Sequence, residues 1–502
     1  MARVITNGMS LSRAREASLG VLPAQPQWFE LEPNSINSFG TTVGKTTRTP
    51  ISKARARRKG VVTDLDSAVE VEADLTITHL VQAAEEFLFA RAVGGDRYLA
   101  VAAAAGGYTV ASLSSAQAGR LRSGAGGTTL VYAYGFVNAA NNGLKPITAA
   151  GAAGATNIAV AGNAVEAVDA DDLVEVAIAG MRFAAGDLSI DAEGNLNTTA
   201  GDFVAAGIVA GQQVHIGGID VLHQFASPDN IGMARVAAVT AKKLTLAKRD
   251  QAFVAEAPAG SMDLLYGSFV RNVDSDHPDF FQPSTQFELR SPGLMADGSA
   301  GHEYAIGNWA DSLSIAIPLS GKATITLGYV GQDTTKPTAA RAANAATAKA
   351  GGLTGAFGTA SDIARLRVQD TDEAGLSTDF KTATFTLTNN VAGEKVLGHL
   401  GPKYLNAGDI EADVENTMLF TNADVIERIR CNKTVGFDWV LRNGDGGIAF
   451  DLPAGTLEGG AREFPANQSV TIATTFRAHQ DDNPGFTCGI SFFPVLPPQP
   501  CA

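Results

Sequence analysis

The sequence predicts a mainly β protein with one long helix, and three observations lead to this fold class. Two stretches, 63–75 and 409–415, alternate acidic and apolar residues with the period of two that a strand imposes. Most of the remaining chain consists of short apolar-alternating runs separated by Gly, Asn and Pro, the residues that interrupt strands. A single long segment, 78–92, has helical spacing instead.

The two alternating stretches put their carboxylates on one face of each predicted strand. The other face is apolar, with Val69 and Val71 in the first stretch and Val414 in the second. Nine of the ten positions on the polar faces are acidic, and such like charges repel one another. One interpretation is an ordinary solvent-exposed strand face, and the other is a surface that faces a polyanion without binding it. The acidic residues are Asp64, Asp66, Glu70, Glu72, Asp74, Asp409, Glu411, Asp413 and Glu415.

Capping signals set the expected ends of the helices. Thr78 is the expected N-cap of the long helix, and Gly94–Gly95 is expected to end it. A second, short helix is expected over 423–430, because Thr421 and Asp424 have the spacing of a capping box.

Composition divides the chain into three segments. Residues 1–132 contain an extended arm over 1–25, a basic stretch and the long helix. Residues 133–255 are Gly-rich and carry short strand patterns. Residues 256–502 return to strands around a long loop at 333–360, which we expect to be flexible.

The middle segment contains a weak internal repeat. Each copy has a Gly-containing run, then an Asn followed by Gly, then a short apolar strand. Small β units inserted into a parent domain would produce this pattern, and so would coincidence in a Gly-rich composition. The stretches are Gly135–Phe136, Asn142–Gly143 and Ile158–Val160 in one copy, and Gly211–Gly217, Asn230–Gly232 and Leu244–Leu246 in the other.

A basic stretch precedes the first acidic strand. Three interpretations are open: contact with nucleic-acid phosphates, a solvated mobile loop, or a hairpin arm whose bases pair with carboxylates of a neighbouring copy. We favour the hairpin arm, because an acidic protein that assembles needs complementary patches. The bases are Lys45, Arg48, Lys53, Arg55, Arg57, Arg58 and Lys59.

Charge and cysteine usage narrow the class of protein. A net charge of -14 argues against a sequence-reading nucleic-acid binder, although passage of DNA without adhesion is compatible with it. Three widely spaced cysteines predict neither a disulfide framework nor a zinc site. The N-terminus lacks a signal peptide and no stretch is apolar enough to span a membrane, so we expect folding in the cytoplasm and no membrane partner.

Catalytic and metal-binding motifs are weak. Gly44-Lys45-Thr46 lacks the first glycine and the following helix of a phosphate-binding loop, and the histidines form no HExxH pair. Oxygen ligands between Asp274 and Asp279 could hold a divalent cation, but a solvated turn is the simpler interpretation. We therefore expect no catalytic residue, no cofactor and no metal, and classify the protein as a non-enzyme.

One set of stretches follows a characteristic order along the chain: Glu16, Gly20–Ala24, Trp28, Asp74–Thr76 and Phe87–Leu88, and later Gly207–Gly217, Ala234–Thr240 and Gly408–Val414. In this order of features the chain resembles the major tail tube proteins of long-tailed, siphovirus-like bacteriophages.

This resemblance implies a tail-tube-type β-sandwich or barrel core with a flanking helix, formed by 1–132 and 256–502, with 133–255 as inserted β units on the outside. It implies a virion protein that forms stacked hexameric rings, whose acidic strand faces line a lumen for DNA ejection. The implied partners are further copies of the chain and other tail proteins: the tape measure, the terminator and the distal tail or baseplate. A surface β-module that binds glycans or a receptor is the alternative.

Overall fold

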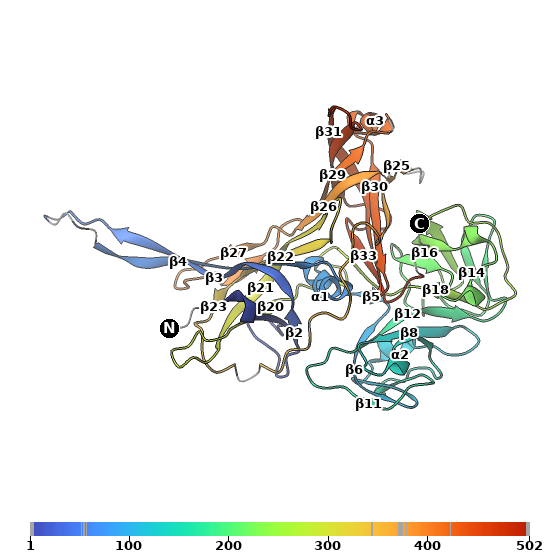
Figure 1. Cartoon of the computed structure of the whole chain (residues 1–502), viewed down its shortest axis with the longest axis horizontal. Helices are drawn as coiled ribbons and strands as arrows, with labels where there is room; N and C mark the ends of the chain where they lie inside the picture. Colours follow the sequence, from blue (N-terminus) through green and yellow to red (C-terminus); the bar gives the residue numbers. More distant parts are fainter. Residues whose placement is uncertain are drawn as a thin grey trace.

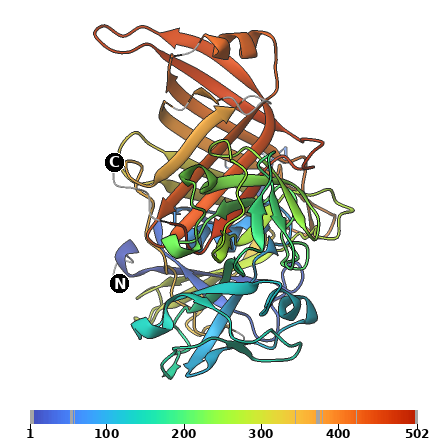
Figure 2. The ribbon, with the colours of Figure 1, turned by 90° about the vertical axis from the view of Figure 1, so that its right-hand side faces the viewer.

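The structure is a computed structural model that describes residues 5–51, 53, 56, 58–342, 345–369, 375–377, 379–421 and 423–497. It is mainly β, as the sequence predicts, and its strands form two large antiparallel sheets (Figure 1). The orange and red strands of the first sheet extend away from the cyan and green second sheet in both views (Figures 1 and 2).

The first sheet combines the two ends of the chain. Eight of its strands follow one another in the order β3-β4-β22-β21-β26-β29-β32-β31, each antiparallel to the next. Their bounds are β3 Pro33–Arg48, β4 Arg58–Asp74, β21 Gly301–Ile317, β22 Thr324–Gly331, β26 Phe380–Thr388, β29 Glu411–Leu419, β31 Gly446–Glu463 and β32 Thr471–His479.

Further strands complete the first sheet. β1 and β2 pair with each other, and β1 also pairs with β20. β24 pairs with β25 and β30. Their bounds are β1 Ser10–Arg15, β2 Trp28–Leu31, β5 Val93–Gly94, β19 Ser268–Arg271, β20 Thr285–Ser291, β23 Asp333–Thr334, β24 Ile363–Gln369, β25 Gly375–Ser377, β30 Val435–Asn443 and β33 Gly489–Phe493, and a separate pair is formed by β27 Ala392–Glu394 and β28 Tyr404–Asn406.

The core of the first sheet lies under its apolar face. Val69 and Val71 of β4 are buried there together with Phe87 of the helix α1 (Ile77–Phe87). The ring of Phe87 meets the ring of Tyr329 edge-on, with centroids 5.2 Å apart. Burial of each large apolar side chain contributes about 1.5 to 3 kcal/mol, so this face holds the helix on the sheet.

The helix ends differ from the sequence prediction. The N-cap of α1 is Thr76 rather than Thr78, because the Thr76 hydroxyl accepts the His79 N–H at 3.1 Å. The helix ends at Phe87 and not at residue 92, since Phe89 already has a left-handed φ of 45°. The short helix α3 (Asp424–Arg430) has Ala423 as its N-cap residue, and this residue forms no side-chain hydrogen bond that caps the helix. The helix α2 (Ser115–Arg120) was not predicted, although Ser114 and Gln117 form its capping box.

The expected extended arm and the expected flexible loop both make buried contacts with distant parts of the chain. In the arm, Arg13 of β1 is buried and lies 3.2 Å from the Glu86 carboxylate. In the 333–360 stretch, the Phe357 side chain is fully buried and Arg341 Nε donates to Glu288 at 2.8 Å. The contacts that hold both segments come from distant parts of the chain, which a local pattern cannot reveal.

The second sheet begins at Arg97, before the 133–255 segment that we delimited from composition, and ends at Leu265. It has its own hydrophobic core. Its strands are β6 Arg97–Ala104, β7 Gly107–Val110, β8 Thr128–Tyr134, β9 Gly143–Pro146, β10 Asn157–Ala159, β11 Glu166–Ala167, β12 Glu175–Phe183, β13 Leu188–Ile190, β14 Leu196–Thr198, β15 Gln213–Ile216, β16 Gly232–Val239, β17 Lys243–Ala247 and β18 Met262–Leu265.

One polar arrangement occurs twice in this second sheet. Asn141 donates to Glu166 at 2.7 Å, and Glu166 also accepts the N–H groups of residues 137 and 138. Asn230 donates to Glu256 at 2.7 Å, and Glu256 accepts the N–H groups of residues 226 and 227. Both asparagines are fully buried. The repeated clasp agrees with the two related units that the sequence suggests.

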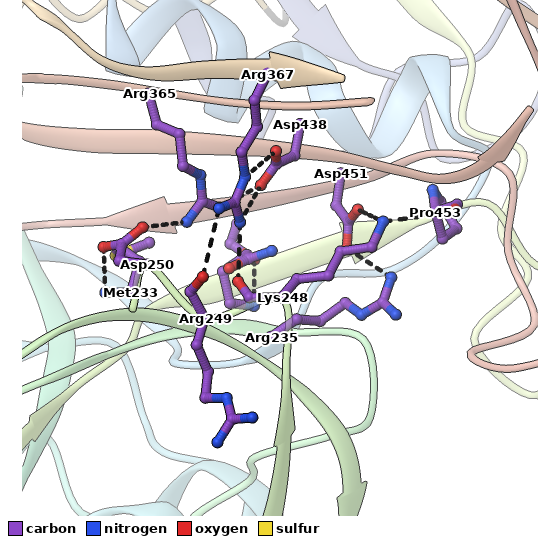
Figure 3. A network of polar contacts seen from close by, with 12 residues as sticks. Met233, Arg235, Lys248, Arg249, Asp250, Arg365, Arg367, Asp438, Asp451 and Pro453 are labelled. Atoms are coloured by element: carbon purple, nitrogen blue, oxygen red, sulfur yellow. Dashed lines mark hydrogen bonds and ion pairs between the residues drawn. The ribbon is translucent and has the colours of Figure 1, made fainter. Parts of the chain in front are cut away.

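A buried charge network joins the two sheets (Figure 3). Asp438 of β30 receives two hydrogen bonds from Arg367 of β24, at 2.8 and 3.2 Å, and an ion pair from Arg365. Arg365 also donates to Asp250, which follows β17 of the second sheet, at 2.6 Å. Asp451 of β31 lies 3.3 Å from Arg235 of the second sheet. Charges buried this deeply must be paired, so the network fixes how the sheets meet.

Candidate functional site

The acidic residues of β4 lie on the face opposite the core, as the alternation predicts. Leu65, Val69 and Val71 are buried, while Asp66 is exposed and Glu70 and Glu72 are half-buried. The alternation arises because successive side chains of a strand point to opposite faces. The strand therefore separates an apolar surface from an acidic one.

β29 repeats this arrangement. Ala412 and Val414 are buried, and Glu411 and Glu415 are exposed on the other face. Asp413 is half-buried there; its burial raises the pKa of the carboxyl, and the neighbouring glutamates act in the same direction. Asp409 precedes the strand and is exposed. The like charges are thus close enough to influence one another.

The sheet brings the two acidic strands to the same face. Residues directly opposite each other across a strand pair point the same way, and one such row runs from Glu72 through Thr326, Ser314 and Thr386 to Asp413. Four strand spacings separate the ends of the row, roughly 19 Å. The two stretches, far apart in sequence, are borders of one surface.

The residues on the surface between the acidic borders are uncharged and have small side chains. No local sequence pattern marks these residues, because each of their strands has by itself the pattern of an ordinary amphipathic strand. They carry hydroxyl groups or very small side chains, and across the three central strands they are Thr324, Thr326, Gly328, Ser312, Ser314, Ala316, Thr384, Thr386 and Thr388.

The cations that reach this surface are paired with its carboxylates. Lys395 binds Asp64 and Asp66 at 2.5 and 2.6 Å, and its hydrogen bond lowers the pKa of Asp64. Lys322 lies 2.6 Å from Asp74. Arg477 of β32 lies 3.2 Å from Asp413 and 2.7 Å from Glu458. Glu72, Glu411 and Glu415 have no ion-pair partner within the described residues.

The basic stretch forms a long hairpin, β3–β4, that projects from the body of the molecule (Figure 1). Arg48 faces Arg58 across the pair, and Lys45 faces Val62. Within the described residues, no ion pair joins a basic residue of the arm to a carboxylate of the same chain. Lys53 lies in a bend and is exposed, and Lys59 lies in β4. Arg55 and Arg57 lie outside the described residues.

The structure gives no support to the weaker motifs. Gly44, Lys45 and Thr46 lie within β3, so no helix follows them to bind a phosphate. Asp279 lies 3.7 Å from Arg271, and its N–H donates to His277 Nδ1. Across the described part of the chain, no group of three or more His, Cys, Asp or Glu side chains is arranged to hold a metal ion.

A comparison with protein families identifies the chain. The model of a family described as phage tail tube protein matches residues 6–478, nearly the whole sequence. A search of curated proteins finds no match. None of the helices described here is long and apolar enough to cross a membrane. On this family match, which covers the second sheet and all of the first sheet except β33 and the last residue of β32, the chain belongs to the phage tail tube proteins, structural proteins of the virion tail.

Proposed function

We propose that this protein assembles into stacked rings with the hexameric arrangement that the resemblance implies, and that the acidic face of the first sheet lines the lumen through which DNA leaves the virion. The observation that carries this proposal is the common surface of β4 and β29, where two acidic borders enclose a floor of Ser, Thr, Gly and Ala.

The chemistry of this surface suits a conduit. DNA carries one negative charge per roughly 1.7 Å of its axis, and each Lys or Arg that contacts a phosphate releases counterions and adds affinity. Lys322, Lys395 and Arg477 are already paired with carboxylates. Unpaired acids repel the polymer, and the hydroxyl-bearing floor offers no net charge, so DNA is kept mobile and away from the wall.

The β3–β4 arm is proposed to contact a neighbouring copy. Arg48 and Arg58 face each other in the hairpin, an unfavourable like-charge pair that an anionic partner would stabilise. The acidic balance of the whole chain makes a second copy a suitable partner. The tape measure, the terminator and the distal tail or baseplate proteins remain proposed partners at the lumen and the tube ends, with synthesis in the cytoplasm of the bacterial host.

Charge reversal at the acidic border tests the lumen. The double substitution Glu70→Lys and Glu72→Lys is expected to leave tubes intact in electron micrographs but to slow DNA release from virions, with the delay shrinking as salt is raised. The matched control is Glu193→Lys with Asp229→Lys, which changes the charge equally at exposed residues in the connections between strands of the second sheet.

The control virions should release DNA at the wild-type rate. Equal release rates for the two double variants would refute the lumen assignment. A reconstruction of the assembled tube in which 64–74 faces outward would refute it as well.

A further inference from the structure

The first sheet is built from two copies of the same arrangement. Unit A consists of β1, β2, β3, β4, α1, β20, β21 and β22, and unit B of β24, β25, β26, β29, α3, β30, β31 and β32. The elements of the two units occur in the same chain order. In unit A the second sheet is inserted after the helix, and in unit B the chain passes directly from helix to strand.

The strand pairings of the two units also correspond. In unit A, β1 pairs with β2 and β20, β4 with β3 and β22, and β21 with β20 and β22. In unit B, β24 pairs with β25 and β30, β29 with β26 and β32, and β31 with β30 and β32. All of these pairs are antiparallel. The helices correspond too, since α1 packs on β21 and α3 on β31.

The two acidic strands are therefore the same strand of the two units. Glu70 precedes Thr76, at the start of α1, by six residues, and Glu415 precedes Thr421, just before α3, by the same number. With this alignment, Phe39 of β3 corresponds to Phe385 of β26, because they face Val69 and Val414 respectively. The acidic pattern occurs twice in the sequence because the unit occurs twice.

One junction joins unit A to unit B within the chain. The second half of β21 pairs with β26, from Ser312 opposite Thr388 to Ile317 opposite Ala383. The corresponding edge of unit B is the second half of β31, residues 456–463, which pairs with β32 on its other side. Within the described residues, no strand occupies this edge of β31, and none occupies the outer edge of β3.

Both free edges leave apolar side chains uncovered. Phe385 of β26, at the occupied junction, is 2% exposed, whereas its counterpart Phe39 on the free β3 is only half-buried. Val43 of β3 is 44% exposed and Phe464, just after β31, is 70% exposed. Open strand edges of this kind invite pairing, and ring closure removes them.

We propose that the second half of β31 pairs with β3 of a second copy of the chain, as β21 pairs with β26 inside one chain. This inference rests on the proposed ring but revises its make-up: the six members of the hexameric arrangement are units rather than chains, so each chain supplies two of them and three chains close the ring. The contact is head-to-tail, joins different surfaces of identical copies, and makes one continuous barrel from eight strands per chain. It also gives each chain two neighbouring sections of the wall.

The alignment gives the register of the new pair. Gly328 lies opposite both Ser312 of β21 and Glu70, and Thr475 lies opposite both Glu458 of β31 and Glu415. Because Glu70 and Glu415 are corresponding residues, Glu458 corresponds to Ser312. Thr388 faces Glu411, and Thr42 faces Asp66. Because Asp66 corresponds to Glu411 in the alignment, Thr42 corresponds to Thr388, the residue opposite Ser312. Glu458 is therefore expected opposite Thr42 of the neighbouring copy.

A disulfide tests both the register and the number of chains. The pair Glu458→Cys and Thr42→Cys is introduced in the full chain with Cys431 and Cys501 replaced by serine, and purified tubes are treated with an added oxidant. Opposed residues have Cβ atoms about 4.5 to 5.5 Å apart, close to disulfide distance. The control pairs Glu458→Cys with Thr46→Cys, which lies about 13 Å further along the strand.

The expected result is a ladder of cross-linked chains that stops at three, with no ladder in the control. Rings of the wild-type protein should independently have three times the 51.9 kDa chain mass in native mass measurement. Rings of six chains would overturn the three-chain stoichiometry, and tubes that never cross-link at 458 and 42 would overturn the strand pairing, while either result leaves the tube itself intact. Protein that forms no ring under any condition would overturn the proposed function and this inference with it.

Discussion

Removal of the Asp438 carboxylate should destabilise the protein strongly, because this group neutralises two arginines where the sheets meet. The substitution Asp438→Asn keeps the volume of the side chain and removes its charge. Asp438 is completely buried, and Arg365 and Arg367 lie 2.5 and 2.8 Å from its oxygens with only 10% and 12% of their side chains exposed. Both guanidinium groups would stay buried with one anion fewer.

The expected loss is about 3 kcal/mol of unfolding free energy, the lower end of the 3 to 5 kcal/mol typical for breaking a buried ion pair. The lower end applies because the arginines keep other partners. Arg365 retains Asp250 at 2.6 Å, and Arg367 retains the carbonyl of Lys248 at 3.0 Å. Such a loss reduces the folding equilibrium constant by about two powers of ten.

Denaturant unfolding of the purified chain, followed by tryptophan fluorescence, measures this loss. Trp439 adjoins the site, is 1% exposed and stacks on Phe450 with ring centroids 4.2 Å apart, so its emission reports on this region. The control is Glu427→Gln, whose carboxylate pairs with Lys433 on the surface and should change stability by under about 1 kcal/mol. Equal, small effects of the two substitutions would refute the reasoning.

Three further substitutions test local assignments. Thr76→Ala should lower the free energy of unfolding by about 1 kcal/mol, because it removes the N-cap of α1. Thr421→Ala should lower it far less, because α3 has no side-chain cap. Similar losses for the two variants in denaturant unfolding would contradict the assigned caps. Desolvation raises the pKa of Asp187, but hydrogen bonds from the N–H groups of residues 199 and 200 and the hydroxyls of Thr198 and Thr199 outweigh it and lower the pKa below its usual value. The ionised Asp187 carboxylate therefore stabilises the protein above about pH 4, and this contribution is lost as the pH falls further. Asp187→Asn should lower the Tm at pH 7 more than at pH 3. An equal decrease in Tm at the two pH values would contradict this.

Local patterns predicted the features that depend on neighbours in sequence. The strand period identified the buried and acidic sides of β4, with Val71 inside and Glu72 outside. Helical spacing located α1, although the cap was displaced by two residues, from Thr78 to Thr76. The capping box of Ser114 and Gln117 is a sequence signal for α2 that the prediction did not include.

Long-range contacts account for the errors. The N-terminal stretch reads as an arm because nothing in 1–25 shows that Arg13 will meet Glu86 and that β1 will lie between β2 and β20. Lys395, Lys322 and Arg477 have no sequence signal that links them to the acidic strands, since each comes from a distant segment.

The sequence by itself determined which residues carry charge and which side of each strand they occupy, because strand alternation follows from the geometry of consecutive residues. Only the tertiary structure decided that β4 and β29 share one face of one sheet, that the floor between them is neutral, and that they are corresponding strands of two like units. Strand neighbours are selected by pairings between segments hundreds of residues apart, and these depend on the packing of the whole core rather than on any local pattern.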